Sequence, residues 1–171
     1  MRNSKMKGFT LIELIVVIAI IGVLAAILVP SMIGYVGDSK LSTANSNAKL
    51  VYTNTATYAT KCEVAGFPMS TGNSVKELNL NTSGVANLPS AVKAPETSAS
   101  VCLGQALQIL MGSKSASAGF ATSVLTAAGT PEKTAWGKSK TDNYIGGYPK
   151  EATAKTNESG GIVLATAEPK T

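Results

Sequence analysis

The residue types that carry out most catalytic chemistry are scarce in this chain. Its 171 residues include no His and two Cys, and Arg2 is the one Arg. The lack of imidazole excludes Ser-His-Asp and Cys-His catalysis, and two thiols without His cannot complete a tetrahedral zinc site. Aromatic residues make up 5% of the chain, which leaves little material for a platform that stacks nucleic-acid bases. A Lys or a carboxylate pair remains available, so an enzyme is disfavoured without being excluded.

The most informative acidic residue is Glu13, because it lies inside an apolar run. Between Phe9 and Val29 only Thr10 and Glu13 are polar. A helix over this run is about 31 Å long, which matches the hydrocarbon core of a bilayer. A carboxylate in hydrocarbon costs about 2.5 kcal/mol or more, so such residues are usually paired or functional.

Charge is distributed unevenly around the apolar run. Met1–Gly8 contains three cations and no acid, and the first charge after the run is Asp38. This asymmetry predicts that the N-terminus stays in the cytoplasm and that the rest of the chain is exported. Beyond Gly8 the chain has 12 Lys against 10 acidic residues, so the net charge of +5 arises mostly from the first eight residues. No specific nucleic-acid partner is therefore predicted.

Three interpretations of the apolar run compete. An ordinary secretory signal has a charged start, a shorter apolar stretch and a cleavage site of small residues, for which residues 23–25 are a candidate. A plain membrane anchor explains the length of the run. A third interpretation must also explain why Gly8 directly precedes Phe9 and why an acid, Glu13, lies four residues after Phe9.

The position of Glu13 itself has two explanations. Near the cytoplasmic headgroups, its side chain simply snorkels to the membrane surface. Alternatively, cleavage between Gly8 and Phe9 creates an α-amine, and the amine of an axially shifted neighbouring subunit meets the carboxylate. Because that pair is desolvated, it contributes register and specificity more than stability.

The N-terminal sequence resembles a known family. Residues Lys7–Glu13 read KGFTLIE and precede an apolar helix, which resembles the cleavage and methylation signature of type IV prepilins. The resemblance implies that prepilin peptidase removes the leader by cutting between Gly8 and Phe9 and that Phe9 is N-methylated. The short leader and the new N-terminal Phe resemble the type IVa class. Glu13, with Thr10, is then the candidate for setting the axial register of assembly.

The resemblance covers Lys7–Pro30 and includes Gly22 and Pro30, which match helix-weakening residues of that family. Pro30 removes a backbone donor and clashes with the preceding turn, so the helix is expected to kink or locally melt there. Gly22 lowers helix stability by about 1 kcal/mol relative to Ala. A melted stretch between them would let the subunit lengthen during packing, a hypothesis that the resemblance supports. A simple kink is the alternative.

The resemblance implies a structural, non-enzymatic subunit of a cell-surface filament that serves motility, adhesion or biofilm formation. Its partners are copies of itself, prepilin peptidase, an assembly platform and, before assembly, the cytoplasmic membrane. No cofactor and no metal site are expected. A minor pilin, or a pseudopilin of a secretion or DNA-uptake system, is the first alternative. A secreted binding protein or enzyme with an ordinary signal peptide is the second.

The chain beyond Pro30 continues as an amphipathic helix to about Thr60. Apolar and small residues recur at spacings of three and four, which places them on one helix face. Together with the apolar run, they predict one helix of about 50 residues. The expected organisation is a leader at 1–8, a filament-core helix at 9–30, the amphipathic half of that helix at 31–60, and a head at 61–171. The residues of the predicted face are Leu41, Ala44, Ala48, Val51, Thr55 and Tyr58.

The head is predicted to be a small antiparallel sheet packed on the long helix, which gives an α+β fold. The best strand candidates are Phe120–Leu125 and Ile162–Thr166, and Asn143–Tyr148 is a third. We expect a short helix near Val75–Leu80, whereas Val101–Met111 fits either a strand or a helix. Two further expectations are a core position for Trp136 and a solvated C-terminal segment at 150–171.

Cys62 and Cys102 lie in the exported part, where a disulfide is permitted. The bridge would close a loop of about 40 residues and contribute about 4 kcal/mol in the chain-entropy model. Two free buried thiols are the alternative. In the pilin family a disulfide closes a loop near the C-terminus, so this placement departs from the family pattern.

Overall fold

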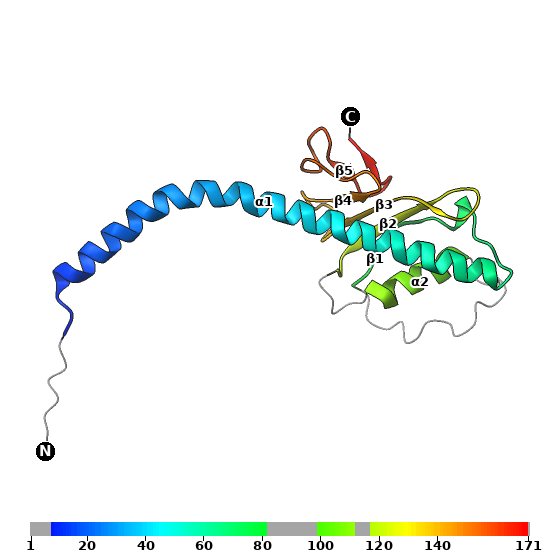
Figure 1. Cartoon of the computed structure of the whole chain (residues 1–171), viewed down its shortest axis with the longest axis horizontal. Coiled ribbons are helices and arrows are strands. Elements are labelled where there is room, and N and C mark those ends of the chain that lie inside the picture. Colours follow the sequence, from blue (N-terminus) through cyan, green and yellow to red (C-terminus); the bar gives the residue numbers. More distant parts are fainter. Residues whose placement is uncertain (1–7, 82–98, 112–116, 171) are drawn as a thin grey trace, which may run out of the picture. The chain divides into compact units, whose positions relative to one another are not determined.

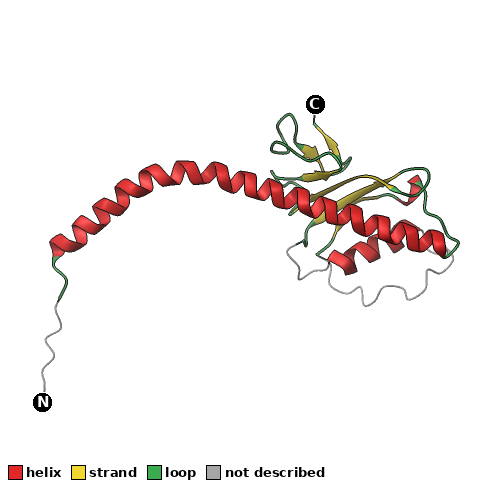
Figure 2. Cartoon of the chain, viewed as in Figure 1, coloured by secondary structure: helices red, strands yellow, loops and turns green. Residues whose placement is uncertain are grey.

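The computed structural model of the chain describes residues 8–81, 99–111 and 117–170 (Figure 1). Two compact units are distinguished: Met1–Asp38, here called the N-terminal segment, and Ser39–Thr171, here called the head. Helix α1, Leu11–Val64, belongs to both. The head adds a short 3-10 turn, a second helix and two sheets (Figure 2). The elements are η1 (Thr71–Asn73), β1 (Val75–Asn79), α2 (Ala99–Met111), β2 (Phe120–Leu125), β3 (Pro131–Gly137), β4 (Gly146–Tyr148), β5 (Ile162–Val163) and β6 (Glu168–Pro169).

The predicted long helix is confirmed. Helix α1 has 54 residues and ends four residues beyond the expected Thr60. The predicted apolar face is also confirmed, since it forms the buried stripe of α1 within the head, with Leu41 half-buried at its start. The buried residues of α1 are Ala44, Asn47, Ala48, Val51, Thr55, Tyr58, Ala59 and Cys62.

The main sheet is antiparallel, with the order β1-β2-β3-β4. One face packs on α1 and α2 and forms the larger core, which includes Val51, Leu107, Ala121 and Trp136. The opposite face packs on the C-terminal residues, which include the small β5-β6 sheet, in a second cluster. The head is therefore an α+β unit in three layers, with the helices, the main sheet and the C-terminal segment stacked in that order.

Small residues bring α1 very close to the edge of the sheet. A Cβ atom at Gly146 of β4 would overlap the backbone of Ala44 and Asn45 on α1. The Asn45 side chain uses this proximity: its Oδ1 accepts from Gly147 N at 3.1 Å and from Ala152 N at 3.0 Å. Its Nδ2 donates to the carbonyl of Ala152 at 3.0 Å. One amide side chain thus joins α1 to β4 and to the segment that follows.

Two buried hydroxyl contacts also connect the main sheet to α1. Thr134 Oγ1 of β3 donates to the carbonyl of Ala48 at 2.8 Å. Further along, Ser123 Oγ of β2 donates to Thr55 Oγ1 at 3.1 Å, and Thr55 in turn donates to the carbonyl of Val51. All three hydroxyl residues are fully buried, so these bonds satisfy groups that would otherwise carry a desolvation penalty. They also fix the register of the sheet along the helix.

Several predictions for the head need correction. The short helix expected at Val75–Leu80 is wrong, because residues 75–79 form β1 and pair with β2 through a bulge between Val75 and Leu78. Pairing with a buried neighbour outweighs the helical propensity of a segment this short. The ambiguous segment Val101–Met111 is helical, as part of α2. The central strand β3 was not predicted from the sequence.

Two strand predictions are correct in part and one is fully confirmed. Phe120–Leu125 is β2 with the predicted bounds. Only the last three residues of Asn143–Tyr148 form a strand, β4, and only the first two of Ile162–Thr166 form β5.

The expectation of a fully solvated C-terminal segment is wrong. Ile162 and Leu164 are buried against Ala135 and Ile145, together with the small residues Ala152 and Ala167. An ion pair between Lys133 of β3 and Glu168 of β6 closes this layer at the surface. The Lys133 ammonium, through its hydrogen bond and its charge, holds the pKa of the Glu168 carboxyl below its usual range.

Trp136 lies in the core, as predicted. Its side chain is 4% exposed, and its indole N–H donates to the carbonyl of Ser117 at 2.8 Å. Since it is the one Trp in the chain, its fluorescence reports the integrity of the head alone.

The close approach at Gly146 predicts a large effect of one methyl group. Gly146→Ala should lower the free energy of unfolding of the head by about 3 kcal/mol, because β4 must move away from α1 to make room. The measurement is denaturant unfolding of the full chain in detergent micelles, followed by Trp136 fluorescence.

The matched control is Gly104→Ala in α2. A Cβ atom there would lie 3.4 Å from Leu78 Cδ1, an ordinary contact, and Ala is favoured over Gly inside a helix by about 1 kcal/mol. This variant should be neutral or slightly stabilised. Equal stability of the two variants would contradict the close α1–β4 packing.

Candidate functional site

The predicted cleavage point lies in exposed, non-helical chain. Gly8 and Phe9 precede the first residue of α1, Leu11, and neither is in a helix or a strand. The Phe9 side chain is 84% exposed. A protease binds its substrate in an extended conformation, so a peptide bond placed just before the helix is accessible without unwinding α1.

Thr10 and Glu13 form a reciprocal cap at the start of α1. The Glu13 carboxylate accepts a hydrogen bond from Thr10 N at 2.9 Å and a second from Thr10 Oγ1 at 2.6 Å. In return, Glu13 N donates to Thr10 Oγ1 at 3.3 Å. This is a capping box, in which two backbone donors that a helix N-terminus leaves unpaired are satisfied by side chains.

The capping box gives Glu13 a role that the sequence argument missed. The signal was present, since Thr-x-x-Glu directly before an apolar run is a helix-start pattern. Both side-chain hydrogen bonds use the same carboxylate oxygen, Oε2. The second oxygen, Oε1, has no hydrogen-bond partner among the described residues. One oxygen of the carboxylate is thus hydrogen-bonded within its own chain, and the other is a free acceptor among the described residues.

The surface of α1 in the N-terminal segment is apolar and uncovered. It includes Ile12, Ile18, Val23 and Ile27, which are each more than half exposed. Mean hydropathy reaches 3.2 in the most apolar stretch of α1, and none of that stretch is buried within the chain. By length and composition, α1 is the one helix in the described part of the chain that is able to cross a membrane.

Gly22 and Pro30 do not interrupt the helix. Both lie inside α1, which is continuous from Leu11 to Val64. Pro30 has no N–H, so the carbonyl four residues before it loses its usual donor. Ser31 Oγ donates to the carbonyl of Leu28 at 2.9 Å in the same turn. A Cβ atom at Gly22 would meet nothing within 4 Å, so this Gly leaves a notch in an open surface. The melting expected between these residues is therefore absent from the single chain.

Cys62 is buried at the C-terminal end of α1. Cys102 belongs to α2, but its side chain lies outside the described residues, so the Cys62–Cys102 disulfide stays a prediction.

Among the described residues, no three His, Cys, Asp or Glu side chains gather as they do in a metal site.

Comparison with known proteins places the similarity in this same N-terminal region. The family model described as the prokaryotic N-terminal methylation motif matches residues 3–29. The N-terminal segment carries this methylation motif. The match includes the Gly8–Phe9 bond, the capping box and almost all of the exposed apolar helix.

Pilins and fimbrial proteins of several bacteria are similar to part of this chain. The type IV major pilin protein PilA of Myxococcus xanthus is 53% identical over 51 residues, which is 30% of this chain and 23% of that protein. The fimbrial protein EcpC of Eikenella corrodens is 57% identical over 44 residues, 26% of this chain and 29% of EcpC. The type IV major fimbrial protein FimA of Dichelobacter nodosus is 55% identical over 40 residues, 23% of this chain and 26% of FimA.

The aligned region spans about a quarter of the length of these curated relatives. No solved structure matches the chain. The family match therefore bears on residues 3–29, and the architecture of the head is known from the structure alone.

The capping box predicts different effects for two substitutions of Glu13. Gln preserves the hydrogen-bonding pattern of the box, so Glu13→Gln should leave the first turn of α1 intact. Glu13→Ala removes the acceptor and should destabilise that turn by about 1 kcal/mol, the typical value of a helix cap. Amide hydrogen exchange at residues 13 and 14, whose N–H groups are hydrogen-bonded to Thr10, measures the difference in detergent micelles. About fivefold faster exchange is expected for the Ala variant.

Exchange at residues 44–51, deep in the head, is the internal control and should be the same in both variants. Equally slow exchange at residues 13 and 14 in the two variants would contradict the capping role.

Proposed function

We propose that the chain is the structural subunit of a type IV pilus and has no enzymatic activity. The observation that carries the proposal is the combination of an exposed Gly8–Phe9 bond, a capping box and an apolar helix surface that the chain leaves uncovered. The similar proteins, all named as type IV pilins or fimbrial proteins, support the same function.

The first step is processing of the precursor. Prepilin peptidase hydrolyses the peptide bond between Gly8 and Phe9, which releases the leader of residues 1–8 and leaves an α-amine on Phe9. Methylation of that amine follows. The capping box starts after the cleaved bond, so Thr10 and Glu13 keep α1 folded up to its first turn while the leader is removed.

In the second step, the N-terminal segment leaves the lipid and comes into contact with other copies of the chain. Before assembly, the N-terminal segment lies in the cytoplasmic membrane, with its N-terminus inside. In the filament, the same surface packs against neighbouring helices. Small residues allow helices to approach closely, and α1 carries four of them within two turns of its exposed surface. They are Ala19, Gly22, Ala25 and Ala26.

Glu13 provides the axial register that the apolar surface lacks. Apolar contact is non-directional, so helices in contact slide easily along one another. The free Oε1 atom of Glu13 is available to the α-amine of Phe9 in an axially shifted neighbour, while Oε2 remains bound to Thr10. One carboxylate thus caps its own helix and fixes the position of the next subunit.

The stretch between Gly22 and Pro30 is the proposed site at which the subunit changes its length in the filament. The single chain is helical there, but the missing N–H of Pro30 and the low helix propensity of Gly22 make this the least stable part of the N-terminal segment. We propose that packing in the filament melts this stretch, so that the subunit lengthens to fit.

The partners of the proposed subunit are further copies, prepilin peptidase, and an assembly platform in the cytoplasmic membrane. The assembled product is a cell-surface filament. Two of the similar proteins cited above are named major pilin or major fimbrial proteins, which favours a major subunit over a minor pilin or pseudopilin.

Mass spectrometry of the mature N-terminus tests the processing step. We expect the chain purified from the cell surface to begin at Phe9 with one N-methyl group. An ordinary signal peptide would instead give a start near Ala26 and loss of the apolar helix, which would contradict the proposal.

The charge of Glu13 is tested separately from its capping role. Glu13→Gln preserves the capping box but cannot form an ion pair with an amine, so the variant should insert into membranes normally and assemble poorly. Filament yield relative to the membrane pool is the measurement, with a loss of about tenfold or more expected for a broken buried pair. Normal filaments from Glu13→Gln would remove the ion-pair account of register.

A further inference from the structure

The head has a cavity at the end where the chain enters it. This cavity, here called the socket, has a volume of 460 Å³. Its lining includes Lys40 and Thr43 of α1 together with Trp136, Lys138, Asp142 and Tyr144 from β3 and the loop that follows. The volume is within the range that proteins use for small ligands or for a few inserted side chains.

The socket is positively charged. Lys40 Nζ lies 5.6 Å from the centre of the Tyr144 ring, and Lys138 Nζ donates to the carbonyl of Ala118 at 3.3 Å. The carboxylate of Asp142 accepts backbone hydrogen bonds from Lys138 N at 3.1 Å and Tyr144 N at 3.0 Å. Backbone donors therefore compensate the one acid of the lining, whereas the two ammonium groups have only neutral partners among the described residues. The socket favours an anionic occupant with an apolar part that contacts its rings.

The opposite end of the head carries an exposed turn, here called the knob, made of residues 63–67. Helix α1 ends there in a Schellman motif, with Gly66 at φ +84°. Gly66 N donates to the carbonyl of Glu63 at 3.0 Å, and Phe67 N donates to that of Cys62 at 2.9 Å. Val64 is 85% exposed and Phe67 is 37% exposed. The knob therefore presents apolar side chains on a backbone that is already fixed.

Glu63 gives the knob a negative charge that no ion pair among the described residues neutralises. The ion pairs of the described residues are Lys133–Glu168, Lys140–Glu77 and Lys155–Glu158, and none involves Glu63. An acid in the last turn of a helix is opposed by the helix dipole, so Glu63 gains from an external cation. Lys61 lies two residues earlier, on a different helix face, and remains exposed.

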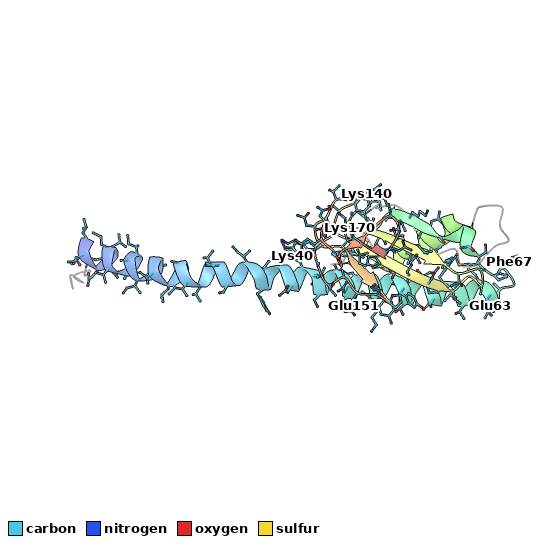
Figure 3. The ribbon with its side chains drawn as sticks, turned by 90° about the horizontal axis from the view of Figure 1, so that it is seen from above. Lys40, Glu63, Phe67, Lys140, Glu151 and Lys170 are labelled. Carbon is cyan, nitrogen blue, oxygen red and sulfur yellow. The ribbon has the colours of Figure 1, made fainter. Side chains whose placement is uncertain are left out.

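The two features lie at opposite ends of the head. In Figure 3, Lys40 marks one end, with Lys140 and Lys170 on the same side, whereas Glu63 and Phe67 mark the other. Lys40 and Glu63 are joined by continuous helix, so they are about 35 Å apart within one chain. A contact between them can form only between two molecules.

We propose that the knob of one subunit inserts into the socket of another subunit in the filament. The occupant is a second copy of this chain, because the knob supplies both the anion and the apolar side chains that the socket favours. The inference rests on the proposed function. Subunits that point the same way and are shifted along the filament bring unlike ends of their heads together. A contact between two different surfaces of the same protein is heterologous, and when its rotation does not close it builds an open helical filament.

Zero-length carbodiimide crosslinking of purified wild-type filaments tests the inference. The reagent joins an ammonium group to a carboxylate only when the two are in contact. We expect crosslinked peptides that join Glu63 to Lys40 or Lys138 in filaments, and none in the detergent-solubilised chain. Because of the separation within one chain, such a product reports an intermolecular contact.

The outcomes separate the inference from the proposed function. Filaments that form but contain no Glu63 crosslink to Lys40 or Lys138 would overturn the knob-and-socket contact and leave the pilus function standing. A processed wild-type chain that forms no filament would overturn both. A crosslink from Lys40 or Lys138 to another acid of a neighbouring subunit would also overturn the contact, because it assigns the socket a different occupant.

Charge reversal gives an independent measurement. Glu63→Lys and Lys40→Glu should each weaken subunit association by about two- to fivefold, as expected for an exposed ion pair, measured as filament dissociation on dilution at low salt. The double variant should recover the wild-type value. Glu151→Lys, which changes an exposed acid away from the knob, is the matched control and should dissociate like wild type. Trp136 fluorescence checks that each head is folded. No recovery in the double variant would contradict the pairing.

Discussion

The uncovered apolar surface of α1 is the constraint on which the rest of the molecule depends. None of the most apolar stretch of this helix is buried within its own chain. Exposure of that surface to water is strongly unfavourable, so an apolar cover such as lipid or other copies of the chain is favoured. The chain accordingly consists of two chemically different parts, an apolar helix without a core of its own and a more polar head that has one. The need for an apolar cover also explains why polar groups in the helix are few and specifically placed.

Glu13 shows how one acid is retained in such a helix. The N-terminal turn of any helix leaves backbone N–H groups unpaired, and these are costly in hydrocarbon. The Glu13 carboxylate and the Thr10 hydroxyl satisfy two of those groups, so the carboxylate is solvated by its own helix. The capping box thereby lowers the free-energy cost of a charged carboxylate in an apolar environment. A charge kept for capping is then available, through Oε1, for a second role between subunits.

The sequence was most informative where a single segment determines the structure. The length of α1 and its buried face at Ala44, Ala48 and Val51 follow from periodicity alone. The processing signature and the Thr10–Glu13 capping box are also local patterns. Strands β1 and β3 were not predictable in this way, because pairing with β2 and burial of Trp136 decide their conformation. The socket is built from residues about 100 positions apart in the sequence, so no local pattern indicates it.

The two kinds of contact proposed for the filament have different physical roles. Burial of α1 against other copies supplies a large, non-directional force, and the Glu13 pair restricts axial sliding. Neither contact fixes the rotation of one head relative to the next, because helices in a bundle rotate at little cost when their surfaces are uniformly apolar. The proposed knob-and-socket contact lies between heads, so a rotation of one head relative to the next would break it. Being an exposed ion pair with limited apolar area, that contact is weak and salt-sensitive. A strong core and weak contacts between heads would together give a polymer that is stable and has a defined helical twist.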